Sequence, residues 1–157
     1  MKNKYISKYN CEFNLPNNYN AVSADKSVFE NALVKFSCGD KFDFQLLFEG
    51  TTVQNSMAMY FDFVKIKYNS DGFSIKSTNY FEFFRSDSKT QVMECVIHFE
   101  PTNEDFVCYF FKYDERFNYV GAFAFKKQVM ELEKYREIST EVFASMSSAL
   151  KKLEENY

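Results

Sequence analysis

The chain has 157 residues and a formal net charge of −3, with 20 Phe, 11 Tyr and no Trp. This length predicts a single domain, residues 1–157, that buries a core without needing disulfides or bound metals. The small negative charge argues against a nucleic-acid-binding protein. We expect neither a signal peptide nor a membrane span, because no long apolar segment follows the early lysines.

The sequence contains four cysteines and no CxxC motif. The cytoplasm is the expected location, and thiols stay reduced in that compartment. We therefore expect free, buried thiols, in preference to disulfides or a zinc site, at Cys11, Cys38, Cys95 and Cys108.

The first fifty residues predict strands on either side of one short helix. Residues 9–15 alternate apolar and polar side chains, which is typical of a strand, and Pro16 is expected to end it. Residues 23–32 favour a short helix with a capping side chain at its start. Two further strands are expected at 34–38 and 41–49, joined by a tight turn at a Gly-Asp pair.

The middle of the chain predicts a run of antiparallel strands. We interpret residues 57–68 as a strand with a β-bulge near its centre, because the apolar side chains change parity there. Strands are then expected at 73–84 and 92–100, followed by a hairpin over 106–125. Both faces of this hairpin are apolar, whereas a strand with one solvated face alternates, so both faces must be covered.

The second strand of the hairpin has one small face and one aromatic face. Val120, Ala122 and Ala124 form the small face, on which we expect the C-terminal helix to pack. Gly121 indicates that another backbone approaches closely there, or that the strand bulges. The other face is expected to line the concavity of a curved sheet or to meet a partner, and it carries Tyr119, Phe123 and Phe125.

From Lys126 onward the apolar residues recur with the period of a helix. We expect one amphipathic helix over about 127–155, packed on one face of a sheet formed by about 8–125. The fold class is therefore α+β: an antiparallel β-meander of seven or eight curved strands, a short N-terminal helix and a long C-terminal helix. This order of elements is similar to the helix-grip arrangement. The expected apolar stripe of the helix is Leu132, Tyr135, Ile138, Val142, Phe143, Met146, Ala149, Leu150 and Leu153.

Candidate catalytic groups are few. His98 is the only histidine, and Glu94 and Glu100 share its strand face, so a carboxylate–imidazole pair for acid/base chemistry is one hypothesis. A solvated ladder of polar side chains has the same pattern, and we favour it. The glycines are isolated, so no phosphate-binding loop is expected. We expect no cofactor, no metal and no enzymatic activity.

Lysines interleaved with aromatic residues on the middle strands are one pattern by which a sheet binds single-stranded nucleic acid. Residues 56–90, however, hold five basic and four acidic side chains. This near balance indicates a mixed, solvated surface, and nucleic-acid binding is not expected.

The segment from Glu94 to Glu115 combines acidic and aromatic residues. It holds six acidic side chains and one basic side chain, Lys112, a net charge of −5. Acidic groups around aromatic anchors suit a basic protein partner, because charge steers the encounter and the rings supply binding energy. Acidic turns that flank two ordinary core strands give the same pattern. The candidate partner-binding residues are Glu94, Glu100, Glu104, Asp105, Tyr109, Phe111, Tyr113, Asp114 and Glu115.

These features predict a cytoplasmic, non-catalytic protein-binding module without nucleic-acid or membrane partners. The most concrete form is a small acidic inhibitor of a basic protein, as a bacterial immunity or antitoxin protein is for a toxin domain. The alternative is a carrier that encloses an apolar small molecule in a helix-grip-like cavity lined by Phe and Met side chains.

Overall fold

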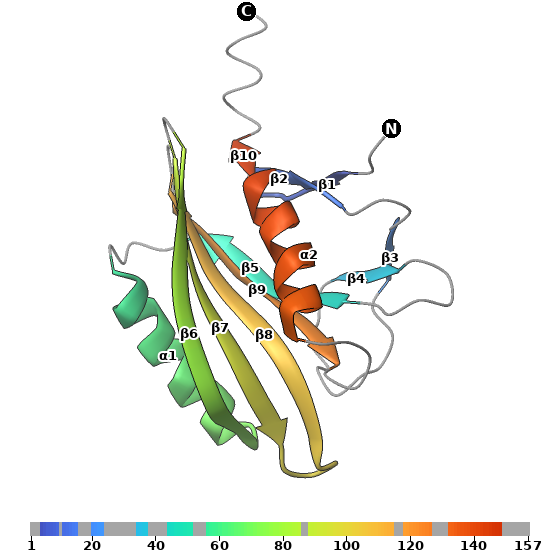
Figure 1. The fold of residues 1–157 in the computed structure, drawn as a ribbon, viewed down its shortest axis with the longest axis vertical. Coiled ribbons are helices and arrows are strands. Elements are labelled where there is room, and N and C mark those ends of the chain that lie inside the picture. The colour runs from blue at the N-terminus through green and yellow to red at the C-terminus, as the bar shows by residue number, and fades with distance from the viewer. Residues whose placement is uncertain are drawn as a thin grey trace, which may run out of the picture.

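The computed structural model shows two antiparallel sheets and two helices (Figure 1). It describes residues 4–9, 11–15, 20–23, 34–37, 44–51, 56–85, 88–114, 118–126 and 132–148. The large sheet has the order β3-β4-β5-β9-β8-β7-β6. Its strands are β3 (Asn20–Ser23), β4 (Val34–Ser37), β5 (Phe44–Thr51), β6 (Phe73–Phe84), β7 (Lys89–Phe99), β8 (Glu104–Asp114) and β9 (Asn118–Lys126). The small sheet is β1 (Lys4–Ile6), β2 (Cys11–Asn14) and β10 (Ser147–Ser148), and the helices are α1 (Met57–Ser70) and α2 (Leu132–Ala144).

The α+β class and the antiparallel pairing agree with the sequence, but the strand order is not that of one meander. The chain leaves the middle of the sheet after β5, crosses through α1 to the far edge, and returns inward through β6, β7 and β8. β9 then pairs with both β8 and β5. The expected hairpin is therefore the centre of the sheet, which explains why both of its faces are apolar.

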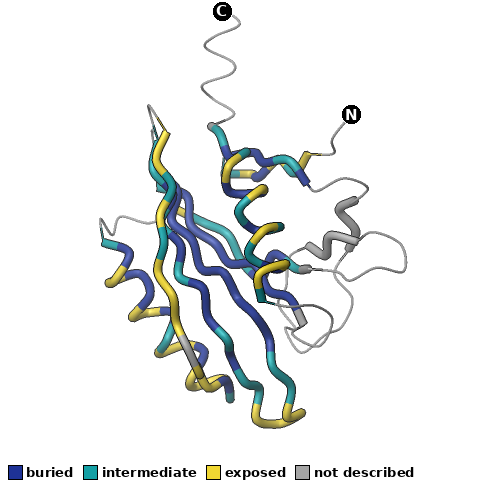
Figure 2. Tube along the Cα trace, in the orientation of Figure 1, coloured by how far each residue is buried: buried dark blue, intermediate teal, exposed yellow. Residues whose placement is uncertain are grey.

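The two helices lie on opposite faces of the large sheet (Figure 1), which we call the α1 face and the α2 face. Each face is filled by its own cluster of buried side chains, and the central strands are buried along most of their length (Figure 2). Cys11 and Phe13 of the small sheet, and Leu15 directly after β2, belong to the cluster on the α2 face. The chain's own side chains thus cover both faces of the hairpin.

Residues 57–70 form helix α1, and the expected bulged strand at 57–68 is wrong. Ser56 has extended backbone angles, and its side chain accepts a hydrogen bond from the Met59 amide at 3.4 Å, which starts the helix. Gly72, with φ of +92°, follows its end. The residues that α1 buries against the sheet recur at helical spacing: Met57, Tyr60, Phe61, Val64 and Tyr68.

Helix α2 is shorter than the expected 127–155 and ends at Ala144. The Ser145 hydroxyl donates to the Val142 carbonyl at 2.7 Å and accepts from the Asn14 amide at 2.8 Å, so it satisfies a helix-end group and binds β2. The chain then forms β10, which pairs with β2. Residues 127–131 and 149–157 lie outside the described residues.

The N-terminal part departs from the sequence interpretation in two places. β2, expected within the large sheet, belongs to the small sheet with β1 and β10. β3 was not expected, and this strand ends at Ser23. The remainder of the expected helix, residues 24–32, lies outside the described residues.

The expected side for the terminal helix is also wrong, because α2 packs on the aromatic face of β9. The ring centroids of Phe123 and Phe143 are 5.7 Å apart, and those of Phe125 and Tyr135 are 5.0 Å apart. The small face receives α1, whose Tyr60 hydroxyl donates to the Gly121 carbonyl at 3.0 Å. Bulky rings fill the space under α2, whereas small residues on β9 leave room for the large side chains of α1.

Ser139 of α2 carries a buried hydroxyl group that forms no hydrogen bond with the described residues. It is 1% exposed, and its hydroxyl has no hydrogen-bond partner among the described residues. We expect Ser139→Ala to raise the free energy of unfolding by about 1 kcal/mol, because the change removes a buried unpaired hydroxyl and introduces a better helix former. Urea unfolding checks this. An unchanged or lowered value would show that the hydroxyl is satisfied in solution.

Candidate binding surfaces

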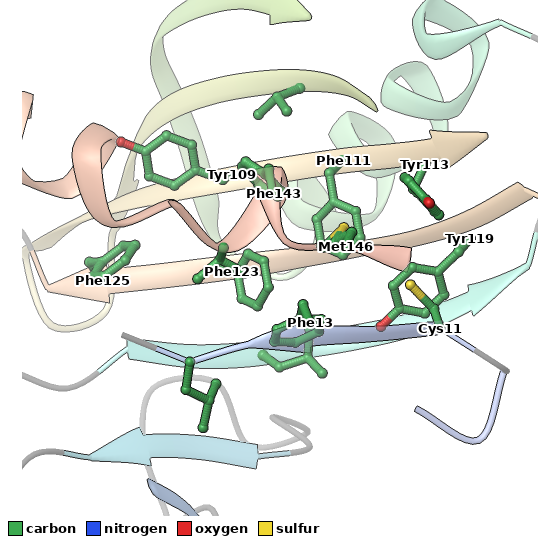
Figure 3. Packing of buried hydrophobic residues seen from close by; sticks show 14 of the residues in the cluster. Cys11, Phe13, Tyr109, Phe111, Tyr113, Tyr119, Phe123, Phe125, Phe143 and Met146 are labelled. Carbon is green, nitrogen blue, oxygen red and sulfur yellow. The ribbon is translucent and has the colours of Figure 1, made fainter. Parts of the chain in front are cut away.

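The three aromatic residues expected as partner anchors lie in the core. Tyr109 and Phe111 are 0% exposed and Tyr113 is 1% exposed. They point from β8 to the α2 face, where Phe143 of α2 contacts the rings of Tyr109 and Phe111 (Figure 3). Alternate residues of a central strand face a helix, so their aromatic character serves packing. These three residues are not exposed anchors, which corrects that part of the candidate site.

Glu94 is also buried, at 3% exposed, and it anchors α2 to the sheet. The Arg136 Nη2 and Nε groups donate to its two carboxylate oxygens at 2.7 and 3.0 Å, and the Tyr109 hydroxyl donates at 2.8 Å. Hydrogen bonding to Glu94 raises the pKa of the Arg136 guanidinium. This bidentate pair gives Glu94 a structural role.

Asp114 lies at the opposite end of β8 from Glu104, roughly 33 Å away along an 11-residue strand. Its two carboxylate oxygens accept hydrogen bonds from the Lys112 ammonium at 2.6 and 2.7 Å. Lys112 is 2% exposed, so Asp114 neutralises a buried charge. Glu115 lies outside the described residues. The structure therefore does not bring Asp114 together with the other acidic candidates.

Glu100, Glu104 and Asp105 do lie together, at the turn between β7 and β8, with Glu104 paired to Phe99 and Asp105 to His98 in the ladder. Asp71, after the end of α1, joins them, because the Glu100 amide donates to the Gly72 carbonyl at 3.0 Å. The Lys76 ammonium nitrogen lies 3.5 Å from Asp105 Oδ2 and forms an ion pair with it. We call the four carboxylates at 71, 100, 104 and 105 the acidic end of the sheet.

His98 lies in a row of three side chains on adjacent strands, with Ser74 of β6 on one side and Asp105 of β8 on the other. His98 Nδ1 is 2.7 Å from Asp105 Oδ1, and this hydrogen bond is the main cause that lowers the pKa of Asp105. The Ser74 hydroxyl, however, donates to Glu100 at 2.9 Å, and no hydrogen bond joins it to His98 in the described part of the chain. The row resembles a nucleophile–base–carboxylate set in order but not in hydrogen bonding.

The outer face of α1 carries an apolar stripe that the sequence interpretation missed. Met59, Phe63 and Ile66 are 51%, 61% and 69% exposed and lie within about 60° of one another, opposite the side that packs on the sheet. Beside this outer stripe, Lys65 pairs with Asp62 at 3.1 Å. The change of parity that suggested a bulged strand was the available signal, because a helix with two apolar sides gives that pattern.

The described cysteines are free and buried, as expected, and Cys38 lies outside the described residues. Cys95 and Cys108 are partners in the β7–β8 ladder, on the α1 face. Burial raises the pKa of Cys95 to about 12, and that of Cys108 is also raised. These thiols therefore stay protonated and unreactive near neutral pH.

Neither helix in the described part of the chain is long and apolar enough to cross a membrane. No protein-family model and no curated protein matches this chain. Among solved structures, the solution structure of cyanobacterial PsbP (CyanoP) from Synechocystis sp. PCC 6803 is similar, with a TM-score of 0.60 at 12% sequence identity. The alignment covers 93% of this chain and 91% of that chain. At this identity the likeness concerns the fold alone.

Proposed function

We propose that this chain is a non-catalytic protein-binding module that acts in the cytoplasm and docks through the outer stripe of α1. The observation that carries the proposal is the exposure of Met59, Phe63 and Ile66 on a helix whose opposite side is already buried. Large apolar side chains that cluster on one exposed surface are typical of an interaction site. A single helix that presents residues at this spacing fits a hydrophobic groove of a partner.

We propose further that the partner is basic, as the target of an immunity-like or antitoxin-like inhibitor would be. The outer stripe leads into the acidic end, because Ile66 lies about 7.5 Å along the helix axis from the C-cap residue Asp71. Glu100, whose side chain is 63% exposed, lies beside that cap. Apolar contacts on the stripe would supply affinity, and the carboxylates would accelerate association with a basic surface.

The dense packing of aromatic side chains on both faces of the large sheet favours this proposal over a carrier of an apolar small molecule. On the α2 face, Phe111 and Phe123 stack at 5.2 Å and contact Phe143. On the α1 face, the ring centroid of Phe110 lies 5.7 Å from that of Phe61 and 5.5 Å from that of Tyr68. Ring contacts of this kind occupy the positions that would line a carrier's cavity.

Affinity capture from the native lysate tests the proposal when three baits are compared. The wild-type protein, the stripe variant Phe63→Ser with Ile66→Ser, and the control Ile6→Ser are each washed at about 0.1 M salt and at several times that concentration. Ile6 is 65% exposed on β1, so the control removes a similarly exposed apolar side chain elsewhere. We expect the wild type and the control to retain one basic protein that the stripe variant loses, with weaker retention at high salt.

Two results would contradict the proposal. If the stripe variant retained the same protein as the wild type, the outer stripe would not be the docking surface. If no protein were retained by any bait at either salt concentration, the binding-module assignment would fail.

A further inference from the structure

Strand β6 forms one edge of the large sheet. Among the described strands its ladder partner is β7, so the backbone groups on its other side face outward. An exposed edge of this kind is a template for pairing with another strand. β6 has 12 residues, which makes the edge long for a sheet that protects itself by short edge strands.

The protective features of this edge are concentrated in its first half. The register shifts between Ile75 and Ser77, and Lys76 lies within that irregularity. Residues 78–84, with the sequence TNYFEFF, pair with β7 without a break and contain no Pro and no Gly. The segment contains one charged side chain, Glu82, whose Oε2 lies 3.7 Å from the Lys89 ammonium nitrogen and forms an ion pair with it. This composition is that of a segment that pairs readily with another strand.

The second half of β6 is also open on the α1 face. α1 lies beside one end of β6 (Figure 1). This is the end at which the strand begins, because the ring centroid of Phe73, its first residue, is 5.4 Å from that of Tyr68 in α1. Beyond the helix, Tyr80 is 44% exposed and Phe84 is 66% exposed on this face. Together they present roughly 200 Å² of aromatic surface next to the open backbone. A partner strand on the edge would cover part of this surface.

We propose that the occupant of this edge is a second copy of the chain, paired antiparallel through residues 78–84 about a two-fold axis at Phe81. In this register Glu82 lies opposite Tyr80 of the second copy, and Thr78 lies opposite Phe84. Tyr80 already donates to Glu82 within its own chain at 2.8 Å, so the carboxylate meets phenol groups and no second carboxylate. Such an interface is self-complementary, as a two-fold dimer requires.

The size of the contact sets the strength of the dimer. The paired segment and its two exposed aromatic residues bury less than the roughly 800 Å² per partner of a standard stable interface. We therefore expect a dimer that dissociates on dilution. This inference does not rest on the proposed basic partner, because it concerns a different surface and is measured on the isolated protein.

Sedimentation velocity over about 1–500 μM, with two charge variants, tests the pairing and its register. Thr78→Lys with Phe84→Lys sets a pair of ammonium groups opposite each other at each end of the paired segment, and we expect self-association to weaken on the order of tenfold or more. Thr78→Lys with Phe84→Glu sets opposite charges at the same positions, and we expect it to retain the dimer. Both variants change exposed side chains. Circular dichroism of each variant checks that it folds like the wild type.

Hydrogen exchange on the wild-type protein gives a measurement without substitutions, and we expect the amides of residues 78–84 to gain protection as concentration rises. A wild-type protein that stays monomeric over the whole range would overturn the inference. Equal self-association of both variants would overturn the register, and with it the proposed dimer. Protection of this edge only in the presence of a different protein would overturn the second copy as its occupant.

Discussion

Glu94→Gln is expected to lower the free energy of unfolding by about 2–3 kcal/mol, measured by urea or guanidinium unfolding. The carboxylate is buried and accepts hydrogen bonds from Arg136 and from the Tyr109 hydroxyl. An amide of the same shape carries no charge and places an N–H group against one of these donors, so a buried charge-assisted network is broken. The loss is below that of a fully buried ion pair because the Arg136 side chain is 41% exposed and recovers some hydration.

Lys134→Ala on the same helix is the matched control. Its ammonium lies 3.5 Å from Glu137, and both side chains are more than 60% exposed. We expect a change below about 0.5 kcal/mol, because exposed ion pairs contribute little. Equal effects of Glu94→Gln and Lys134→Ala would contradict the anchoring role of Glu94.

The second large effect is expected at Gly121, where Gly121→Ala should lower the free energy of unfolding by about 2–3 kcal/mol. A Cβ atom there would lie 2.7 Å from Phe111 Cζ and 2.7 Å from the Phe48 carbonyl oxygen. The first contact is a ring packed in the core and the second is backbone of β5, so neither moves away at low cost. Chemical denaturation measures the effect.

Gly50→Ala provides the comparison, since a Cβ at Gly50 meets nothing within 4 Å. Gly50 lies on the neighbouring strand, paired with Val120, so the backbone context is similar. We expect a neutral result or a gain of a few tenths of a kcal/mol from the reduced freedom of the unfolded chain. If Gly121→Ala were tolerated as well as Gly50→Ala, the close packing of β5, β8 and β9 would be wrong.

The sequence predicted those elements whose pattern is local. The strands expected within 106–125 form as β8 and β9, because their apolar runs favour strand formation without help from elsewhere. The helical stripe from Leu132 to Phe143 forms α2 for the same reason. The end of α2 depends on Ser145 contacting Asn14, 131 residues away, and no local pattern carries that information.

The helix at 57–70 was missed because its apolar residues serve two sides. Phe61 and Val64 pack on the sheet while Phe63 is exposed, so the sequence shows nearly continuous apolar character and its parity suggests strands. A helical wheel of residues 57–70 shows two apolar sides. It predicts the helix only if one of these sides is allowed to remain exposed to solvent. That exposed side is the outer stripe on which the proposed function rests.

The candidate surface was predicted in part. Glu100, Glu104 and Asp105 do lie together, since a turn brings the ends of neighbouring strands close. The aromatic residues between them could not be placed, because alternation along β8 does not say which face a helix covers, or that both are covered. The partner of Glu94, Arg136, lies 42 residues away on a different element. Long-range pairing of this kind decided between a surface carboxylate and a buried anchor.

Titration calorimetry tests the proposed docking surface. The captured partner is titrated against the wild type, the stripe variant Phe63→Ser with Ile66→Ser, and the acidic-end variant Glu100→Lys with Glu104→Lys. We expect the stripe variant to lose affinity by about tenfold or more at every salt concentration, because apolar burial is insensitive to screening. The acidic-end variant should lose affinity at low salt and approach the wild type as salt rises. Wild-type affinity for both variants at low salt would contradict the assignment of this surface.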